Sequence, residues 1–118
     1  MSPTTPAGAD GHGDPSHRVL DHAAATFALL ASSTRLHIMW VLAESDSDVS
    51  SLGARVGRAL PTISQHLTQL KMGGLVHARR EGRRHVYSIR DPRVLTIVKL
   101  MIGQLSEGPR PETAPAQY

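Results

Sequence analysis

Residues 61–90 of the chain read PTISQHLTQLKMGGLVHARREGRRHVYSIR. The first half of this segment has the pattern of an amphipathic helix that begins at Pro61 and ends at the glycine pair 73–74. Its apolar positions recur at helical spacing and are Ile63, Leu67 and Leu70. The opposite face suits the reading of DNA base edges, although an ordinary solvated helix face would have the same composition. Its side chains are Thr62, Ser64, Gln65, His66, Thr68 and Gln69.

The second half of the segment predicts a β-hairpin, because two short runs, 75–80 and 84–89, flank the turn Glu81-Gly82-Arg83. Four guanidinium groups gather near its tip, where they could meet DNA phosphates. They belong to Arg79, Arg80, Arg83 and Arg84. The whole chain has 118 residues and a formal charge of only +3, yet residues 71–93 carry seven basic and two acidic side chains, or +5. The excess positive charge therefore lies in one short segment.

Three further helices are predicted before this segment. The first keeps one apolar face, made of Leu20, Ala23, Ala24, Phe27 and Leu30. The second begins after the hydroxyl-rich residues 32–34, and its apolar positions are Leu36, Met39, Trp40, Leu42 and Ala43. The third is short, is capped by Asp48 or Ser50, places Leu52 and Val56 inward and stops at Gly57.

A last helix begins at the Asp91-Pro92 cap and is apolar nearly all round. Its apolar residues are Val94, Leu95, Ile97, Val98, Leu100, Met101, Ile102 and Leu105. Because one small domain cannot cover such a helix on every side, we expect it to be buried against a second copy of the chain.

Composition excludes several classes of protein. The chain has no cysteine, which removes disulfides, thiolate metal sites and cysteine nucleophiles. It has no spaced carboxylate pair and no phosphate-binding glycine loop, and Ser64 and His66 face different directions on a helix, so we expect no enzyme. The longest apolar run, 27–31, is too short to span a bilayer, which favours a cytoplasmic protein without a membrane partner.

The ends of the chain differ from its middle, because six of the eight prolines lie there. We therefore expect flexible tails at 1–17 and 108–118 around one folded domain, 18–107. The expected fold is mainly α with a small β-hairpin. A helix, a short turn with glycine, a second helix and a basic hairpin follow one another in the order of a winged helix-turn-helix, in which the second helix enters the DNA major groove. A module that binds an acidic protein partner through the basic hairpin is the competing interpretation.

Several of these motifs also carry a family resemblance, over about residues 27–107. They are Leu52–Gly57, Pro61–Leu67, Gly74–Val76, Arg79–Arg83 and Tyr87–Ile89. In combination they resemble the ArsR/SmtB family of bacterial metalloregulators, and in character the nickel- and cobalt-responsive actinobacterial members. The resemblance implies a homodimeric winged helix-turn-helix repressor that binds a palindromic operator, with the first and last helices at the dimer interface and an effector that weakens DNA binding.

The same resemblance assigns roles to individual positions. Thr62, Ser64 and Gln65 correspond to base-reading residues, and Arg80, Arg83 and Arg84 fall on the wing. The chain departs from the family where a polar helix cap is usual, because residues 59–61 are Ala-Leu-Pro and Leu60 cannot cap a helix with its side chain. This departure concerns the detailed operator preference and not the fold.

The family's known metal sites fit this chain poorly. The cysteine site near residues 49–52 is excluded. At the zinc-type site of the last helix the matching residues are Asp91, Arg93, Gln104 and Glu107, so both imidazoles of that site are missing. His77 and His85 fall on the two strands of the hairpin, where they could lie near one another or be separate surface side chains.

An N-terminal cluster is the remaining metal candidate. His12, His17 and His22 alternate with Asp10, Asp14 and Asp21, and could fold onto the last helix of a partner copy and complete a site with Asp91 and Glu107. Imidazole and carboxylate ligands favour Ni(II), with Co(II) or Zn(II) next, and no organic cofactor is expected. The alternative is that histidine merely recurs in this tail and binds no metal. In that case the regulator has lost direct metal sensing and responds through a partner protein or another small molecule.

Overall fold

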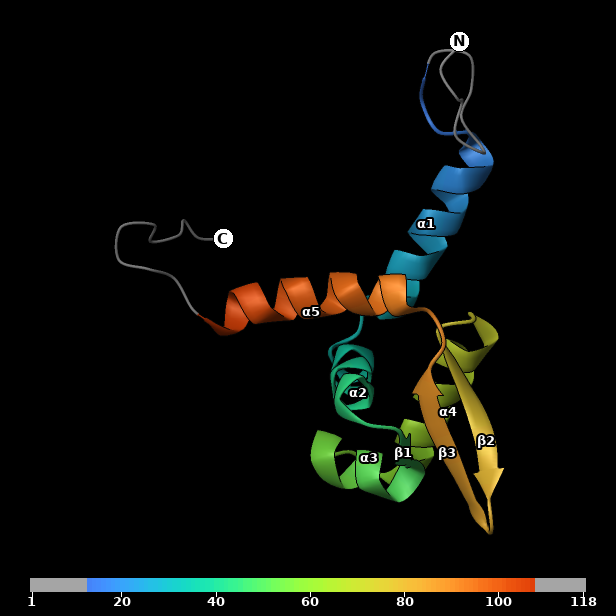
Figure 1. Cartoon of the computed structure of the whole chain (residues 1–118), viewed down its shortest axis with the longest axis vertical. Helices are drawn as coiled ribbons and strands as arrows, with labels where there is room; N and C mark the ends of the chain where they lie inside the picture. Colours follow the sequence, from blue (N-terminus) through green and yellow to red (C-terminus); the bar gives the residue numbers. More distant parts are fainter. Residues whose placement is uncertain (1–12, 108–118) are drawn as a thin grey trace.

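The computed structural model describes residues 13–107, which form five helices and three short strands (Figure 1). In chain order the elements are α1 (His17–Leu30), α2 (Ser33–Glu44), β1 (Ser47–Asp48), α3 (Val49–Val56), α4 (Leu60–Met72), β2 (Val76–Glu81), β3 (Arg84–Ile89) and α5 (Pro92–Ser106). Helix α1 begins at His17, the last residue of the expected N-terminal tail. His12 lies outside the described residues.

Local signals set most helix ends where the sequence predicts them. Ser32 caps α2 by accepting a hydrogen bond from the Arg35 amide, and Asp91 caps α5 in the same way. Of the two candidates for α3, Asp48 is the cap. Gly57 ends α3 in the left-handed conformation, with φ at 77°, where a side chain would be strained.

Helices α3 and α4 are joined by the three residues Gly57, Arg58 and Ala59, as a helix-turn-helix requires. Helix α4 begins at Leu60, one residue before the predicted start. Ala59 occupies the N-cap position and provides no side-chain hydrogen bond, which confirms that the usual polar cap is missing here.

The core is built around α2, which contacts all four other helices and β3. Ile38 and Met39 are fully buried and Val41 is 2% exposed. Ile38 and Val41 are missing from the predicted apolar face because that prediction assumed one buried side, whereas neighbours cover α2 on several sides. Ile63, Leu67 and Leu70 of α4 are fully buried, as predicted.

The sheet has three antiparallel strands in the order β1-β3-β2, so the prediction of a two-stranded hairpin alone was incomplete. Strand β1 has only two residues, too few to show any alternation, and forms because Ser47 pairs with Tyr87 and Asp48 with Val86. The hairpin turn is also tighter than predicted, because Glu81 pairs with Arg84 and only Gly82 and Arg83 form the loop. Gly82 has φ at 63°, as the first loop residue of a type II′ turn requires.

The register separates the two hairpin histidines. His77 pairs with Ser88, whereas His85 pairs with Arg80. Since successive side chains alternate between the faces of a sheet and directly paired residues share a face, His77 and His85 lie on opposite faces. They therefore do not form a pair.

Helices α1 and α5 lie at the end of the molecule opposite the hairpin tip, and each projects away from the helix-turn-helix (Figure 1). Leu30 of α1 and Val94 and Val98 of α5 are buried. Other large apolar side chains of the two helices are exposed in the single chain: Val19, Leu20, Phe27, Ile97, Leu100, Met101 and Leu105. Within residues 13–107 no single helix is long and apolar enough to cross a membrane. Helices α1 and α2 reach that length and composition only as a pair, with a 91° bend between them.

Candidate nucleic-acid interface

Helix α4 presents most of its predicted polar face to solvent. Ser64, Gln65, Thr68 and Gln69 are exposed and Thr62 is half-buried. The Thr68 hydroxyl donates a hydrogen bond of 2.9 Å to the Ser64 carbonyl oxygen, so its proton is already used. The amide groups of Gln65 and Gln69 are the longest hydrogen-bonding groups on this exposed face, and such planar amides can read base edges in a major groove.

His66 differs from its neighbours on α4 because it is half-buried against α2. Its Nδ1 accepts a hydrogen bond of 3.0 Å from Nε of Arg35. Burial lowers the pKa of His66 below its usual range, and the positive charges of Arg35 and Arg58 lower it further. The imidazole is therefore neutral at physiological pH, and one of its two nitrogens already has a partner within the protein.

Two of the four predicted wing arginines are paired with carboxylates. Arg79 donates to Asp46 and to Glu81, each at 2.7 Å. Both carboxylates raise the pKa of Arg79, mainly through these hydrogen bonds. Arg84 lies 3.4 Å from Asp48 and 3.6 Å from Glu81. The result is a continuous chain of ion pairs across the three strands.

Arg80 and Arg83 remain available at the hairpin tip. Arg80 donates to the Gly82 carbonyl oxygen at 3.4 Å, and within residues 13–107 neither side chain forms an ion pair. With Asp46, Asp48 and Glu81 counted, the four wing arginines are offset by three carboxylates. The wing as a whole therefore has a smaller net positive charge than its four arginines suggest.

A groove of about 470 Å³ separates α4 from the wing. Its lining comes from β1, from the start of α3, from α4 and from the hairpin, and consists of Asp48, Val49, Ser50, Ser64, Arg83, Arg84, His85 and Tyr87. Ser64 of the polar helix face and Arg83 of the hairpin tip thus border the same concave surface. The groove therefore places the Ser64 hydroxyl opposite the guanidinium groups of Arg83 and Arg84, with the Asp48 carboxylate also in its lining. A hydroxyl and a guanidinium group on one concave surface can contact a base edge and a phosphate together.

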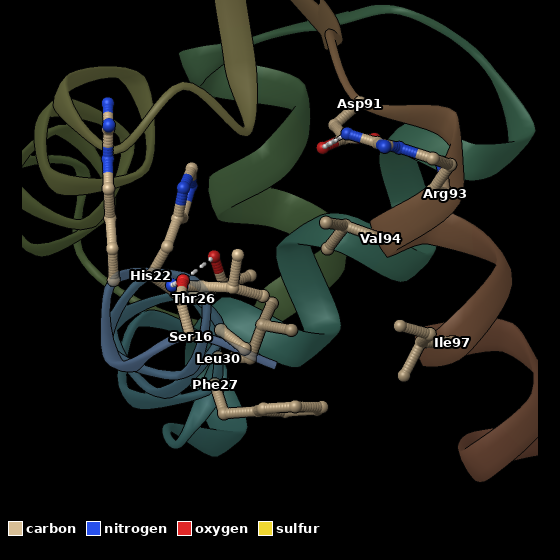
Figure 2. Close-up of a pocket in the computed structure, with 12 residues that line it drawn as sticks. Ser16, His22, Thr26, Phe27, Leu30, Asp91, Arg93, Val94 and Ile97 are labelled. Carbon is tan, nitrogen blue, oxygen red and sulfur yellow. Dashed lines mark hydrogen bonds and ion pairs between the residues drawn. The ribbon is translucent and has the colours of Figure 1, made fainter. Parts of the chain in front are cut away.

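The predicted metal residues are only partly brought together. His22 of α1 and Asp91 at the start of α5 line one groove of about 540 Å³ between these helices, in which Phe27, Leu30, Val94 and Ile97 supply much of the wall (Figure 2). Asp91 is engaged by Arg93, whose Nε lies 3.3 Å from Oδ1. Hydrogen bonds from Arg93 lower the pKa of Asp91.

The other candidates lie elsewhere. His17 is exposed on α1 and does not line this groove. Glu107 follows the far end of α5, roughly 24 Å from Asp91 along the helix axis. No three His, Asp or Glu side chains within residues 13–107 converge well enough to hold a metal ion. The described part of one chain therefore does not form the predicted metal site.

Two residues that contact the groups of this interface escaped the sequence analysis. Asp46 faces the wing only because β1 joins the sheet, and nothing in the local sequence indicates that. The role of Arg35 has one weak indication in the sequence. Arg35 lies in the first turn of α2, where a positive charge opposes the helix dipole, and this suggests that a contact elsewhere compensates for it.

A helix-turn-helix packed on a three-stranded sheet, with a polar second helix and a basic hairpin beside it, defines a winged helix-turn-helix DNA-binding domain. The comparisons identify its family. Residues 32–78 match the model of the arsR family of bacterial regulatory proteins. The SmtB transcriptional repressor of Mycobacterium tuberculosis is 34% identical over 96 residues, which cover 81% of this chain and 67% of SmtB. The chain belongs to the ArsR family.

Two further relatives agree with this assignment. The transcriptional regulator KmtR of Mycobacterium tuberculosis is 38% identical over 72 residues, 61% of this chain and 55% of KmtR. The chain thus spans little more than half the length of KmtR. The solution NMR structure of the homodimeric winged helix-turn-helix DNA-binding domain of Mb0332 from Mycobacterium bovis matches with a TM-score of 0.69 and 33% identity, over 86% of this chain and 91% of that one. The chain therefore carries the winged helix-turn-helix domain of a family of bacterial regulatory proteins.

Proposed function

We propose that two copies of this chain bind a palindromic operator in the cytoplasm and repress transcription. The observation that carries this proposal is the groove bordered by Ser64 and Arg83, which places the Ser64 hydroxyl of α4 and the guanidinium groups of Arg83 and Arg84 of the wing on one concave surface. A two-fold dimer would present two such surfaces to two half-sites of the DNA.

The roles of the individual side chains of α4 and the wing follow from their exposure and pairing. Thr62, Ser64, Gln65, Thr68 and Gln69 would contact base edges. Arg80 and Arg83 would contact phosphates, with a smaller contribution from the paired Arg79 and Arg84. We leave His66 out of the reading surface because Arg35 occupies its Nδ1.

The dimer interface that fits the structure is the apolar surface of α1 and α5. Phe27 is 55% exposed and Leu100 is 66% exposed in the single chain, which is unfavourable for side chains of this size in water. Burial of these faces against the same faces of a second copy would remove that cost. The homodimeric state of the Mb0332 domain supports a dimer of this chain.

DNA binding is tested by titrating duplexes that carry candidate palindromes, at several salt concentrations. We expect at least about a hundredfold preference for a specific palindrome over random duplex, with affinity that falls as salt rises. Binding without sequence preference would contradict the regulator and favour a module for protein–protein contact.

For the effector we propose a transition metal, Ni(II) first and Co(II) or Zn(II) next. The support is the presence of His22 and Asp91 on one groove, together with the chemistry of imidazole and carboxylate ligands. In the described part of one chain no third ligand converges with His22 and Asp91. A metal site would therefore need either His12 or, from a second copy of the chain, His17 and Glu107.

A regulator without direct metal sensing is the alternative, and the Asp91–Arg93 pair favours it. This pair puts a fixed positive charge beside the carboxylate that a metal would need. In this case a separate sensing protein or another small molecule would supply the signal.

Titration of the protein with nickel, cobalt and zinc, with and without operator DNA, distinguishes a metal-sensing regulator from one without direct metal sensing. If metal is the effector, binding should change operator affinity and the His22→Ala variant should weaken that change. The exposed His77→Ala variant, whose side chain lies on the wing, is the matched control. If none of the metals changes operator affinity, the result contradicts metal sensing and favours the regulator without direct metal sensing.

A further inference from the structure

Arg35 connects two helices that are separated in the sequence by about thirty residues. Its Nε donates to Nδ1 of His66 on α4 at 3.0 Å, and its Nη1 donates to the Leu29 carbonyl oxygen in the last turn of α1 at 3.2 Å. Both hydrogen bonds are partly buried. One guanidinium group thus joins the C-terminal end of α1 to the middle of the helix that faces DNA.

A second contact joins the same two helices. A β-carbon placed at Gly73, at the end of α4, would collide with the side chain of Leu29. The close approach shows that the end of α1 lies directly against the end of α4. Leu29 therefore meets α4 through its side chain and, by way of Arg35, through its carbonyl oxygen.

We propose that Arg35 is a positioning residue that couples the end of α1 to the orientation of α4 through His66. This inference rests on the DNA-binding function proposed above and extends it to a residue outside the interface. Helix α1 also forms one wall of the groove with α5. A change at that groove would reach α4 through the Leu29, Arg35 and His66 contacts.

The hydrogen-bond chemistry defines the state of His66. An imidazole that accepts at Nδ1 carries its proton on Nε2 and is neutral. The charged groups facing it are Arg35 on α2 and Arg58 in the turn between α3 and α4, and both are positive. Protonation at Nδ1 would remove the acceptor and place a cation against Arg35, so the link holds only while His66 is neutral.

The first test uses the full-length protein without DNA. Nitrogen-15 NMR of the histidine rings should find His66 as the Nε2–H tautomer, with a pKa below 6.5. In Arg35→Met, which keeps the aliphatic stem but removes the charge, the pKa of His66 should rise. Arg55→Met is the control, because it removes an exposed positive charge from α3 and should leave the pKa of His66 unchanged. An Nδ1–H tautomer, or a pKa that does not respond to Arg35→Met, would overturn the proposal.

The second test measures operator affinity in a double-mutant cycle. Arg35→Met and His66→Phe should each weaken specific binding by about tenfold, and the double variant should lose no more than either single one. His66→Asn should retain near wild-type affinity, because its side-chain oxygen can occupy the position of Nδ1. Circular dichroism and thermal unfolding of each variant confirm that the fold is kept.

Other outcomes have distinct meanings. If His66→Phe and His66→Asn alter the preferred base at one operator position while Arg35→Met does not, His66 reads DNA directly and the positioning role is wrong. If the losses of operator affinity in Arg35→Met and His66→Phe add up in the double variant, the positioning role is also wrong. If the wild-type protein itself shows no operator preference, the proposed DNA-binding function fails, whereas the NMR test still decides whether Arg35 holds His66.

Discussion

Arg79 of the wing donates a 2.7 Å hydrogen bond to Asp46, which precedes it by 33 residues. Asp46 lies in the loop between α2 and β1, so this ion pair ties the hairpin to the helical core. Together with the pairs of Arg84, it divides the basic cluster into two arginines that are compensated and two, Arg80 and Arg83, that are available for phosphate.

The first prediction contrasts two arginines of the same hairpin, Arg83 and Arg79. Arg83→Ala should weaken binding to specific and random duplexes alike and reduce the slope of log affinity against log salt by about 0.9, because one phosphate contact is lost. Arg79→Ala should change the slope less, since carboxylates already compensate Arg79. Salt titrations of both variants measure this. If both variants reduce the salt slope equally, the ion pairs of Arg79 within the protein do not reduce its contact with phosphate.

The second prediction concerns Asp46 itself. Asp46→Asn should increase affinity for random DNA and steepen its salt dependence, because Arg79 loses a competing carboxylate and the wing loses a negative charge. Glu44→Gln makes the same change in net charge at an exposed site paired with Arg55, away from the wing, and serves as the control. A gain of similar size in both variants would mean that net charge alone is responsible.

The third prediction addresses base reading. Gln65→Ala should reduce discrimination at one operator position by about 1–3 kcal/mol while leaving affinity for random duplex nearly unchanged. Gln104→Ala removes an exposed glutamine from α5 and should have no effect on either quantity. Competition experiments over single-base operator variants give the comparison. A uniform loss across all duplexes would assign Gln65 to the DNA backbone instead.

The fourth prediction concerns the dimer. Phe27→Asp places a charge on the apolar surface of α1 and should shift the protein to monomers, as measured by analytical ultracentrifugation. Operator affinity should then fall by at least about a hundredfold, toward the level of non-specific binding. Ala54→Asp introduces the same charge at an exposed position of α3 and should leave the oligomeric state unchanged. A Phe27→Asp protein that remains dimeric would place the interface elsewhere.

The fifth prediction follows from the depressed pKa of Asp91. Because its pKa in the folded chain lies below the ordinary value of 3.8, the carboxylate stabilises the fold above pH 3.8, and this contribution is lost as pH falls through the folded-state pKa. Asp91→Asn still caps α5 but cannot titrate. Thermal unfolding of the variant should therefore lose less stability than wild type between pH 5 and about pH 2. Parallel pH dependences would exclude this role for Asp91.

Much of the fold is predictable because its signals are local. Ser32, Gly57 and Asp91 mark helix ends through hydrogen bonds and backbone angles that involve only neighbouring residues. The periodicity of Ile63, Leu67 and Leu70 places the buried side of α4 correctly, and a glycine flanked by two β-runs predicts the hairpin. The same alternation could not predict β1, because two residues have no period.

The sequence by itself determined the order of the helices, the hairpin, the polar face of α4 and the concentration of arginines beside it. Only the tertiary structure decided which of those groups are available. It pairs Arg79 with Asp46 and holds His66 with Arg35. The physical reason is that a charged or hydrogen-bonding side chain is defined by its nearest partner in space. For Asp46 and His66 that partner comes from more than thirty residues away, where no local pattern can indicate it.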